Sequence, residues 1–186
     1  MDILQTNWAK YGIYYGVISI LIQLISFYVV PINIWLQMLV GIIIMCVTFY
    51  LAGKEERNDK GGVLTYGEAL KTTFLTGFVG LVISTLFLII LIQLVDPGLV
   101  EKLTQMSMDA ARGMMESFGM PEDQMAEALE KAEEDAANSF TPVRQLINIF
   151  TGSIMVLIVA AIMSIFIKKE ADPNAIDLNK IGDSNV

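Results

Sequence analysis

Four long stretches of the chain contain no charged residue, and they restrict the folds that are open to it. They cover residues 11–30, 32–52, 72–95 and 145–167, and each is 20 to 24 residues long. About 20 apolar residues in an α-helix cross the hydrocarbon core of a bilayer. A helix on the surface of a soluble domain shows a polar face, and these stretches show none. The sequence therefore predicts an all-α membrane protein with four transmembrane helices.

The positions of Lys and Arg predict how these spans are threaded. Apart from Arg144, the basic residues nearest the span ends are Lys10, Lys54, Arg57, Lys60, Lys71, Lys168 and Lys169. With four spans, all of them fall on one side of the membrane, and cytoplasmic loops are the ones enriched in basic residues. We expect a multi-pass protein of the bacterial inner membrane, with both termini in the cytoplasm and residues 96–144 outside it. Arg144, at the outer edge of the fourth span, runs against this arrangement. Residues 168–186 are expected to form a polar, disordered cytoplasmic tail.

Short polar motifs predict where helices begin. Thr65 and Glu68 have the spacing of a capping box at the start of the third span. Asp96-Pro97 and Thr141-Pro142 each place a capping side chain before a proline, which suits the first turn of a helix. These motifs predict helix starts on both sides of the segment outside the membrane.

That segment, residues 96–144, holds eleven acidic and four basic residues and is broken at Gly119-Met120-Pro121. Apolar residues recur at helical spacing on both sides of the break, which predicts an extracytoplasmic amphipathic helical hairpin. Its candidate interaction face comprises Met106, Met114, Phe118, Met125 and Leu129. The acidic face of the second arm carries Asp123, Glu127, Glu130 and Glu134. Such a face is either merely solvated or a weak site for divalent cations or a basic partner.

Small residues within the spans predict close contacts between helices. The candidate packing residues are Gly12, Gly16, Thr76, Gly80, Ser84 and Gly152. Small residues at this spacing allow helix backbones to approach closely. The pattern leaves open whether the contacts form within one chain or between two, and we favour one chain. Gln23, Gln37 and Asn148 are expected to form hydrogen bonds between helices.

Composition excludes several classes of function. The net charge of −8 argues against a nucleic-acid partner, because phosphate binding needs clustered Lys and Arg. The chain has no His and a single Cys, which excludes a disulfide framework and a Cys/His zinc site. No Asp, Glu or His lies within the four stretches, which argues against a proton-coupled transporter and an intramembrane hydrolase. We expect no catalytic residues, no metal and no cofactor.

Four sequence motifs carry a resemblance to a known family. They are KYGIYYGVISIL in the first span, LTYGEALKTTFLTGFVGLVIS at the third, VDPGLVEK after it and SFTPVRQLINIF at the fourth. Together with the broken amphipathic hairpin, they make the chain similar to the bacterial membrane family catalogued as domain of unknown function 4199. The resemblance implies a four-span inner-membrane protein and assigns no activity or catalytic residue.

Two hypotheses for function follow from these observations. In the first, the protein is not an enzyme but an interaction or assembly module in the lipid bilayer. It presents the acidic hairpin to another copy of itself or to another membrane or periplasmic protein. In the alternative, it is a small oligomeric channel or facilitator that assembles through Gly12 and Gly16. The acidic hairpin would then concentrate cations at its mouth.

Overall fold

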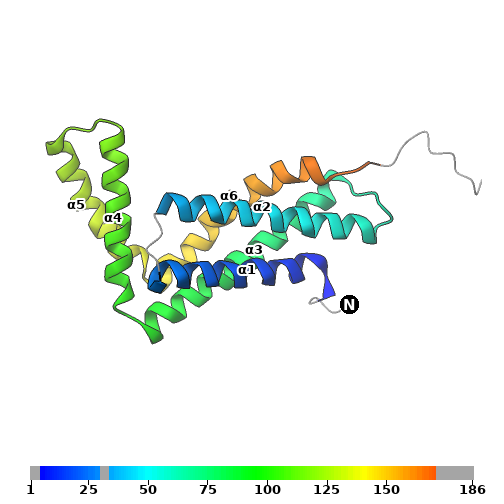
Figure 1. Cartoon of the computed structure of the whole chain (residues 1–186), viewed down its shortest axis with the longest axis horizontal. Helices are drawn as coiled ribbons and strands as arrows, with labels where there is room; N and C mark the ends of the chain where they lie inside the picture. The colour runs from blue at the N-terminus through cyan, green and yellow to red at the C-terminus, as the bar shows by residue number, and fades with distance from the viewer. Residues whose placement is uncertain (1–4, 30–33, 171–186) are drawn as a thin grey trace, which may run out of the picture.

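The computed structural model describes residues 5–29 and 34–170, and their regular structure is helical apart from one isolated bridge between Leu64 and Lys169 (Figure 1). Residues 171–186 of the predicted tail lie outside the described residues, as do residues 30–33 between the first two predicted spans. The helices are α1 (Asn7–Leu24), α2 (Ile34–Asp59), α3 (Tyr66–Ile90), α4 (Leu99–Ser117), α5 (Glu122–Ser139) and α6 (Pro142–Ile167).

Four of the described helices are long and apolar enough to cross a membrane. They are Asn7–Val29, Trp35–Asp59, Tyr66–Val95 and Pro142–Ile167, and each begins or ends several residues beyond the uncharged stretch that predicted it. Their outward faces carry large apolar side chains that no described part of the chain covers: Leu94 is 79% exposed, Phe150 74% and Phe166 72%. Apolar surface of this extent is suited to lipid. These features confirm the predicted all-α class and indicate a multi-pass membrane protein.

The four long helices form a bundle in which α3 is central, because it packs against α1, α2 and α6. Phe49 of α2 and Ala160 of α6 are fully buried in its core. Thr73 of α3 faces α6. Its hydroxyl donates to the carbonyl of Ala69 in its own helix at 2.9 Å and lies 3.2 Å from the hydroxyl of Ser164 in α6. A buried hydroxyl that bonds to its own helix satisfies its polarity without water, as a membrane interior requires.

The predicted caps at Thr65 and Thr141 are present. Thr65 forms the full capping box with Glu68, and Thr141 caps α6 with Pro142 in the first turn. The prediction for Asp96-Pro97 was wrong in detail, since α4 begins at Leu99 with Gly98 in the cap position. The break between α4 and α5 is at Gly119, whose φ of 70° lies in the left-handed region that favours glycine.

Both α1 and α3 end in a π-helical turn, which the sequence did not predict. The turns are Ile25–Val29 and Leu91–Val95, and they lie at the same end of the bundle. Here α4 crosses the ends of the long helices, and α5 returns beside it (Figure 1). We call α4 and α5 the hairpin, and this end of the bundle the hairpin end. The bridge between Leu64 and Lys169 lies at the opposite end.

Candidate functional site

The candidate packing glycines of α1 lie against α3 of the same chain. A Cβ added at Gly12 would come within 2.7 Å of Val79 Cβ, and one added at Gly16 within 2.9 Å of Ile83 Cβ. Real Cβ atoms essentially never approach that closely, so both positions require glycine as the helices stand. The surface formed by Gly12 and Gly16 is therefore occupied within the chain.

The other candidate packing residues lie on α3 and α6. A Cβ at Gly80 would overlap the ring of Tyr15, and one at Gly152 would meet Leu81 at 3.2 Å. Thr76 is fully buried, and its hydroxyl donates to the carbonyl of Thr72 at 2.8 Å. Ser84 is half-buried and donates to the carbonyl of Leu81 at 3.1 Å. The atoms that face the four glycines belong to the same chain, whereas the hydroxyls of Thr76 and Ser84 bond to carbonyls of their own helix.

The structure divides the candidate interaction face of the hairpin into two parts. Met125 is buried and Leu129 half-buried between the two arms, and Met106 packs against the bundle. Met114 is 46% exposed and Phe118, at the tip, is 82% exposed. The sequence grouped all five because they share a helical spacing, but the contact between the arms uses part of that stripe. Only Met114 and Phe118 offer extensive apolar surface.

The acidic face of α5 remains at the surface. Asp123, Glu127 and Glu130 are exposed, and Glu127 forms an ion pair with Lys131 at 3.1 Å. Glu134 belongs to α5, but its side chain lies outside what the structure describes. Among the described residues, no three His, Cys, Asp or Glu side chains come together in a group that could hold a metal ion. The described carboxylates are therefore spread along a helix rather than gathered around a point.

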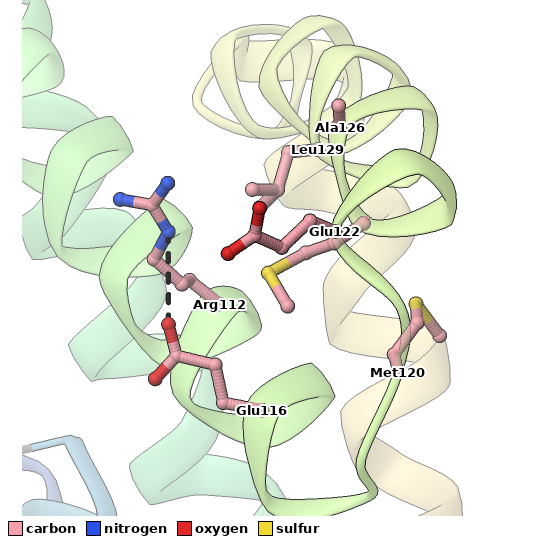
Figure 2. A pocket seen from close by; sticks show the side chains of 7 residues that line it. Arg112, Glu116, Met120, Glu122, Ala126 and Leu129 are labelled. Atoms are coloured by element: carbon pink, nitrogen blue, oxygen red, sulfur yellow. Dashed lines mark ion pairs between the residues drawn. The ribbon is translucent and has the colours of Figure 1, made fainter.

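Charged and apolar residues line a cavity of about 610 Å³ between the two arms near the tip. In Figure 2, Arg112 and Glu116 project from α4 and Glu122 from the start of α5, and all three line the cavity. The nitrogen Nε of Arg112 is 3.9 Å from a carboxylate oxygen of Glu116. These side chains are exposed, so the cavity is a solvated gap between the arms.

Three kinds of contact attach the hairpin to the bundle. The Lys102 ammonium donates to the carbonyl of Phe27, and the Tyr28 hydroxyl donates to Asp96 Oδ2 at 2.7 Å. Leu99 and Leu103 are buried in an apolar cluster with side chains of both π-helical turns. Phe27 and Tyr28 lie within the first π-helical turn, so that turn supplies a carbonyl to Lys102 of α4 and a hydroxyl to Asp96, which lies just before the hairpin.

A second cavity, of about 430 Å³, lies beneath α4. We call it the α4 groove, and its lining includes Gln23, Phe27, Gln37, Met38, Met106 and Phe140. As predicted, Gln37 bonds between helices, because its Oε1 accepts from the Ser26 hydroxyl at 3.1 Å. The prediction was wrong for Gln23, whose Oε1 is buried and has no hydrogen-bond partner in the described structure. Asn148 is exposed on α6.

Polar side chains connect the helices at the opposite end of the bundle. The Asn7 amide donates to Glu56 Oε2 at 3.0 Å and to Asp59 Oδ2 at 2.7 Å, which ties α1 to α2. Lys60 lies 2.7 Å from Glu68, and this hydrogen bond raises the pKa of Lys60. The sequence assigned the basic residues to this end but did not pair them with particular carboxylates.

The comparison with known families identifies the chain. The family model described as protein of unknown function DUF4199 matches residues 10–169. The chain belongs to this family. No curated protein and no solved structure shows a significant match.

The DUF4199 match confirms the resemblance carried by the four sequence motifs. It includes α2 to α6 completely and α1 from Lys10 onward, so the hairpin and the α4 groove both lie inside the family region. The family description assigns no reaction and no ligand. Any function must therefore be argued from the surfaces and cavities of the molecule.

Proposed function

We propose that the protein is a non-enzymatic interaction module of the bacterial inner membrane, which presents the hairpin on the extracytoplasmic side to a partner protein. The bundle acts as the anchor, and the tip of the hairpin makes the contact. The observation that carries the proposal is Phe118, which is 82% exposed at the tip although the first half of α4 is attached to the bundle.

The arrangement of charge supports this orientation. Lys10 pairs with Glu55 at 2.9 Å, and Lys60 pairs with Glu68 at 2.7 Å, so basic residues from different segments gather at the end opposite the hairpin. Basic residues accumulate on the cytoplasmic side of membrane proteins. The hairpin end is then extracytoplasmic, where a segment rich in carboxylates is tolerated.

Charge also selects the kind of partner. Residues 96–144 carry four basic and eleven acidic residues, a net charge of 4 − 11 = −7. Two such hairpins would repel each other, which disfavours a second copy of the chain. A partner with a basic surface around an apolar pocket would attract the acidic face of α5 and accept Phe118. An exposed aromatic side chain is a common energetic anchor of interfaces.

The alternative, an oligomeric channel, has less support. It used Gly12 and Gly16 for contacts between copies, and α3 of the same chain already covers both. We therefore retain the interaction module as the proposed function.

Orientation is tested by labelling a single cysteine. In a Cys46→Ser background, Glu127→Cys should react with a membrane-impermeant maleimide in intact cells whose outer membrane has been permeabilised. Lys60→Cys, at the opposite end, should react only after the inner membrane is opened. The reverse pattern would contradict the orientation and the proposed partner site.

The partner is tested by a photo-crosslinker at Ser117, which is exposed beside Phe118. We expect crosslinks to a different protein, lost at high salt because screening weakens the attraction of exposed charges. Phe118→Ala should reduce crosslinking by about fivefold or more, the effect of losing an anchor worth over 1 kcal/mol. Combined Asp123→Asn, Glu127→Gln and Glu130→Gln should do the same.

Matched controls keep this test specific. Leu94→Ala removes a comparably exposed apolar side chain from the bundle, and Glu101→Gln with Asp109→Asn neutralises carboxylates of α4. Both should leave crosslinking unchanged. Crosslinks only to lipid or to a second copy of the chain would refute a heterologous partner.

A further inference from the structure

The α4 groove has the size and the lining of a ligand site. Its volume of about 430 Å³ lies in the range of small-molecule pockets, which are mostly apolar with a few placed polar groups. Phe27, Met38 and Met106 supply apolar walls, and Gln23, Gln37 and Ser107 supply polar groups. Side chains from α1, α2 and α3 line it from the bundle, and α4 lies across it.

The groove continues outward beneath α4. A neighbouring cavity of about 310 Å³ is lined by Trp35, Met38, Ala110, Ala111 and Met114. Met38 lines both cavities, so they adjoin between the start of α2 and the middle of α4. The outer part is lined by apolar side chains and small alanines, which suits hydrocarbon chains.

Gln23 gives the inner part of the groove its chemical preference. The Gln23 side chain lines the groove, while its Oε1 is buried and has no hydrogen-bond partner in the described structure, so the amide must turn toward the groove for Oε1 to meet a donor there. Leaving a buried acceptor without a donor costs free energy, which a ligand that supplies the donor would recover. Gln23 is six residues before the end of the first span at Val29, about 9 Å below it at 1.5 Å per residue. A donor must therefore reach below the end of the helix.

The lining also sets the charge of that donor and its source. The residues that line the groove include no Asp, Glu, Lys or Arg in the described structure. An ionic donor would be buried there without a counter-charge, so the donor is neutral. Gln23, Phe27, Gln37, Met38 and Leu88 all belong to candidate membrane spans, so the ligand is drawn from the bilayer.

We propose that the α4 groove binds a neutral lipid with a hydroxyl or amide N–H group beside its acyl chains, and that this group donates to Gln23 Oε1. A protein helix is a poorer occupant. A helix is about 10 Å wide, so 430 Å³ holds only about one turn of it. Admitting more would displace α4, which is held in place by the bond from Lys102 to the Phe27 carbonyl and by the burial of Leu99 and Leu103.

The chain offers its own reporter for this lipid. Trp35 lines the outer part of the groove, and the other tryptophan, Trp8, lines a cavity at the opposite end of the bundle. In a Trp8→Phe background, lipids with brominated chains that enter the groove will quench Trp35 fluorescence. The experiment uses the full chain in phosphatidylcholine nanodiscs. It compares brominated diacylglycerol, which has a free hydroxyl, with its acetate ester, which has none.

We expect diacylglycerol to quench Trp35 at a mole fraction about fivefold or more below that of the ester, since a buried acceptor otherwise stays unpaired. In Gln23→Leu the two quenching curves should coincide. Gln93→Leu replaces an exposed glutamine that lies near the same end of α3, and it should keep the difference.

Every outcome decides the proposal. Coincident curves in the Trp8→Phe protein, as for lipids that merely surround the bundle, would overturn it without any groove variant. A difference that persists in Gln23→Leu would also overturn it, because the donor would then bind elsewhere. This inference is independent of the proposed partner, since Phe118→Ala should leave the quenching difference intact.

Discussion

At the contact of α1 with α3, glycines bring two helices so close that an added Cβ has no space, whereas beneath and within the hairpin there are cavities of several hundred Å³. Gly12 and Gly16 lie against Val79 and Ile83 in the first region. Charged and apolar side chains border a gap of about 610 Å³ between the arms in the second. Close backbone approach stabilises helices where lipid gives no hydrophobic drive for their association. The hairpin is only partly buried, and its cavities leave room for ligands and partners.

The sharpest way to break this comparison is to add atoms at the close contact between α1 and α3. Gly80→Leu should destabilise the bundle by about 3 kcal/mol or more, because overpacking a tight contact forces backbone shifts. The free energy of unfolding is measured by circular dichroism in a titration of mixed micelles with a denaturing detergent. Gly41→Leu is the control, since no atom lies within 4 Å of a Cβ at Gly41. Equal effects of the two substitutions would contradict a close contact at Gly80.

Removing atoms beneath the hairpin should affect the hairpin alone. Leu103→Ala deletes a buried side chain from the cluster that holds α4, and such truncations cost about 2 kcal/mol or more. Hydrogen exchange should become faster throughout α4 and α5 while amides of α3 keep their protection. Leu94→Ala, at a position 79% exposed, should leave both unchanged. Loss of protection in α3 as well would show that bundle and hairpin unfold as one unit.

Glycine itself should have opposite roles in the two regions. Gly113 lies on α4 with no atom within 4 Å of an added Cβ, so Gly113→Ala should stabilise the hairpin by about 0.5 to 1 kcal/mol. Gly77→Ala should destabilise the bundle, because its Cβ would come within 2.5 Å of Val156. Hydrogen exchange of α4 measures the first effect, and the detergent titration measures the second. If both substitutions stabilised the protein, or both destabilised it, the proposed difference between the glycines of the two regions would be wrong.

The smallest effect is expected at the surface of α5. Glu127→Gln breaks an ion pair whose side chains are both 75% exposed, and such pairs contribute about 0.5 kcal/mol or less. The hydrogen-exchange protection of α5 in the Glu127→Gln protein should match that of α5 in the unchanged protein within error. A loss above 1 kcal/mol would mean that the acidic face has a structural role that its exposure does not indicate.

Sequence alone predicted the parts of the fold that depend on local chemistry. The length of the four uncharged stretches predicted the four helices that are long and apolar enough to cross a membrane. The capping box followed from Thr65 and Glu68, which are three residues apart. The break at Gly119 followed from glycine and proline near each other. In each case the physical cause lies within a few residues of its effect.

Other features, which depend on contacts between distant segments, were not predicted. Met125 and Phe118 share a helical stripe, yet one is buried between the arms and the other exposed, because only tertiary packing tells them apart. Gln23 looked like an ordinary partner for another helix, and its unpaired Oε1 emerges only from the placement of α1, α2 and α4. The π-helical turns have no motif that would reveal them.

Leu64 and Lys169 exchange two backbone hydrogen bonds, at 2.8 and 2.9 Å, just before α3 and just after α6. Tension applied to the chain beyond Lys169 is shared with the start of α3, and both bonds must yield before α6 can unwind from that end. A domain fused after Lys169 would therefore pull on α3, the central helix of the bundle, as well as on α6.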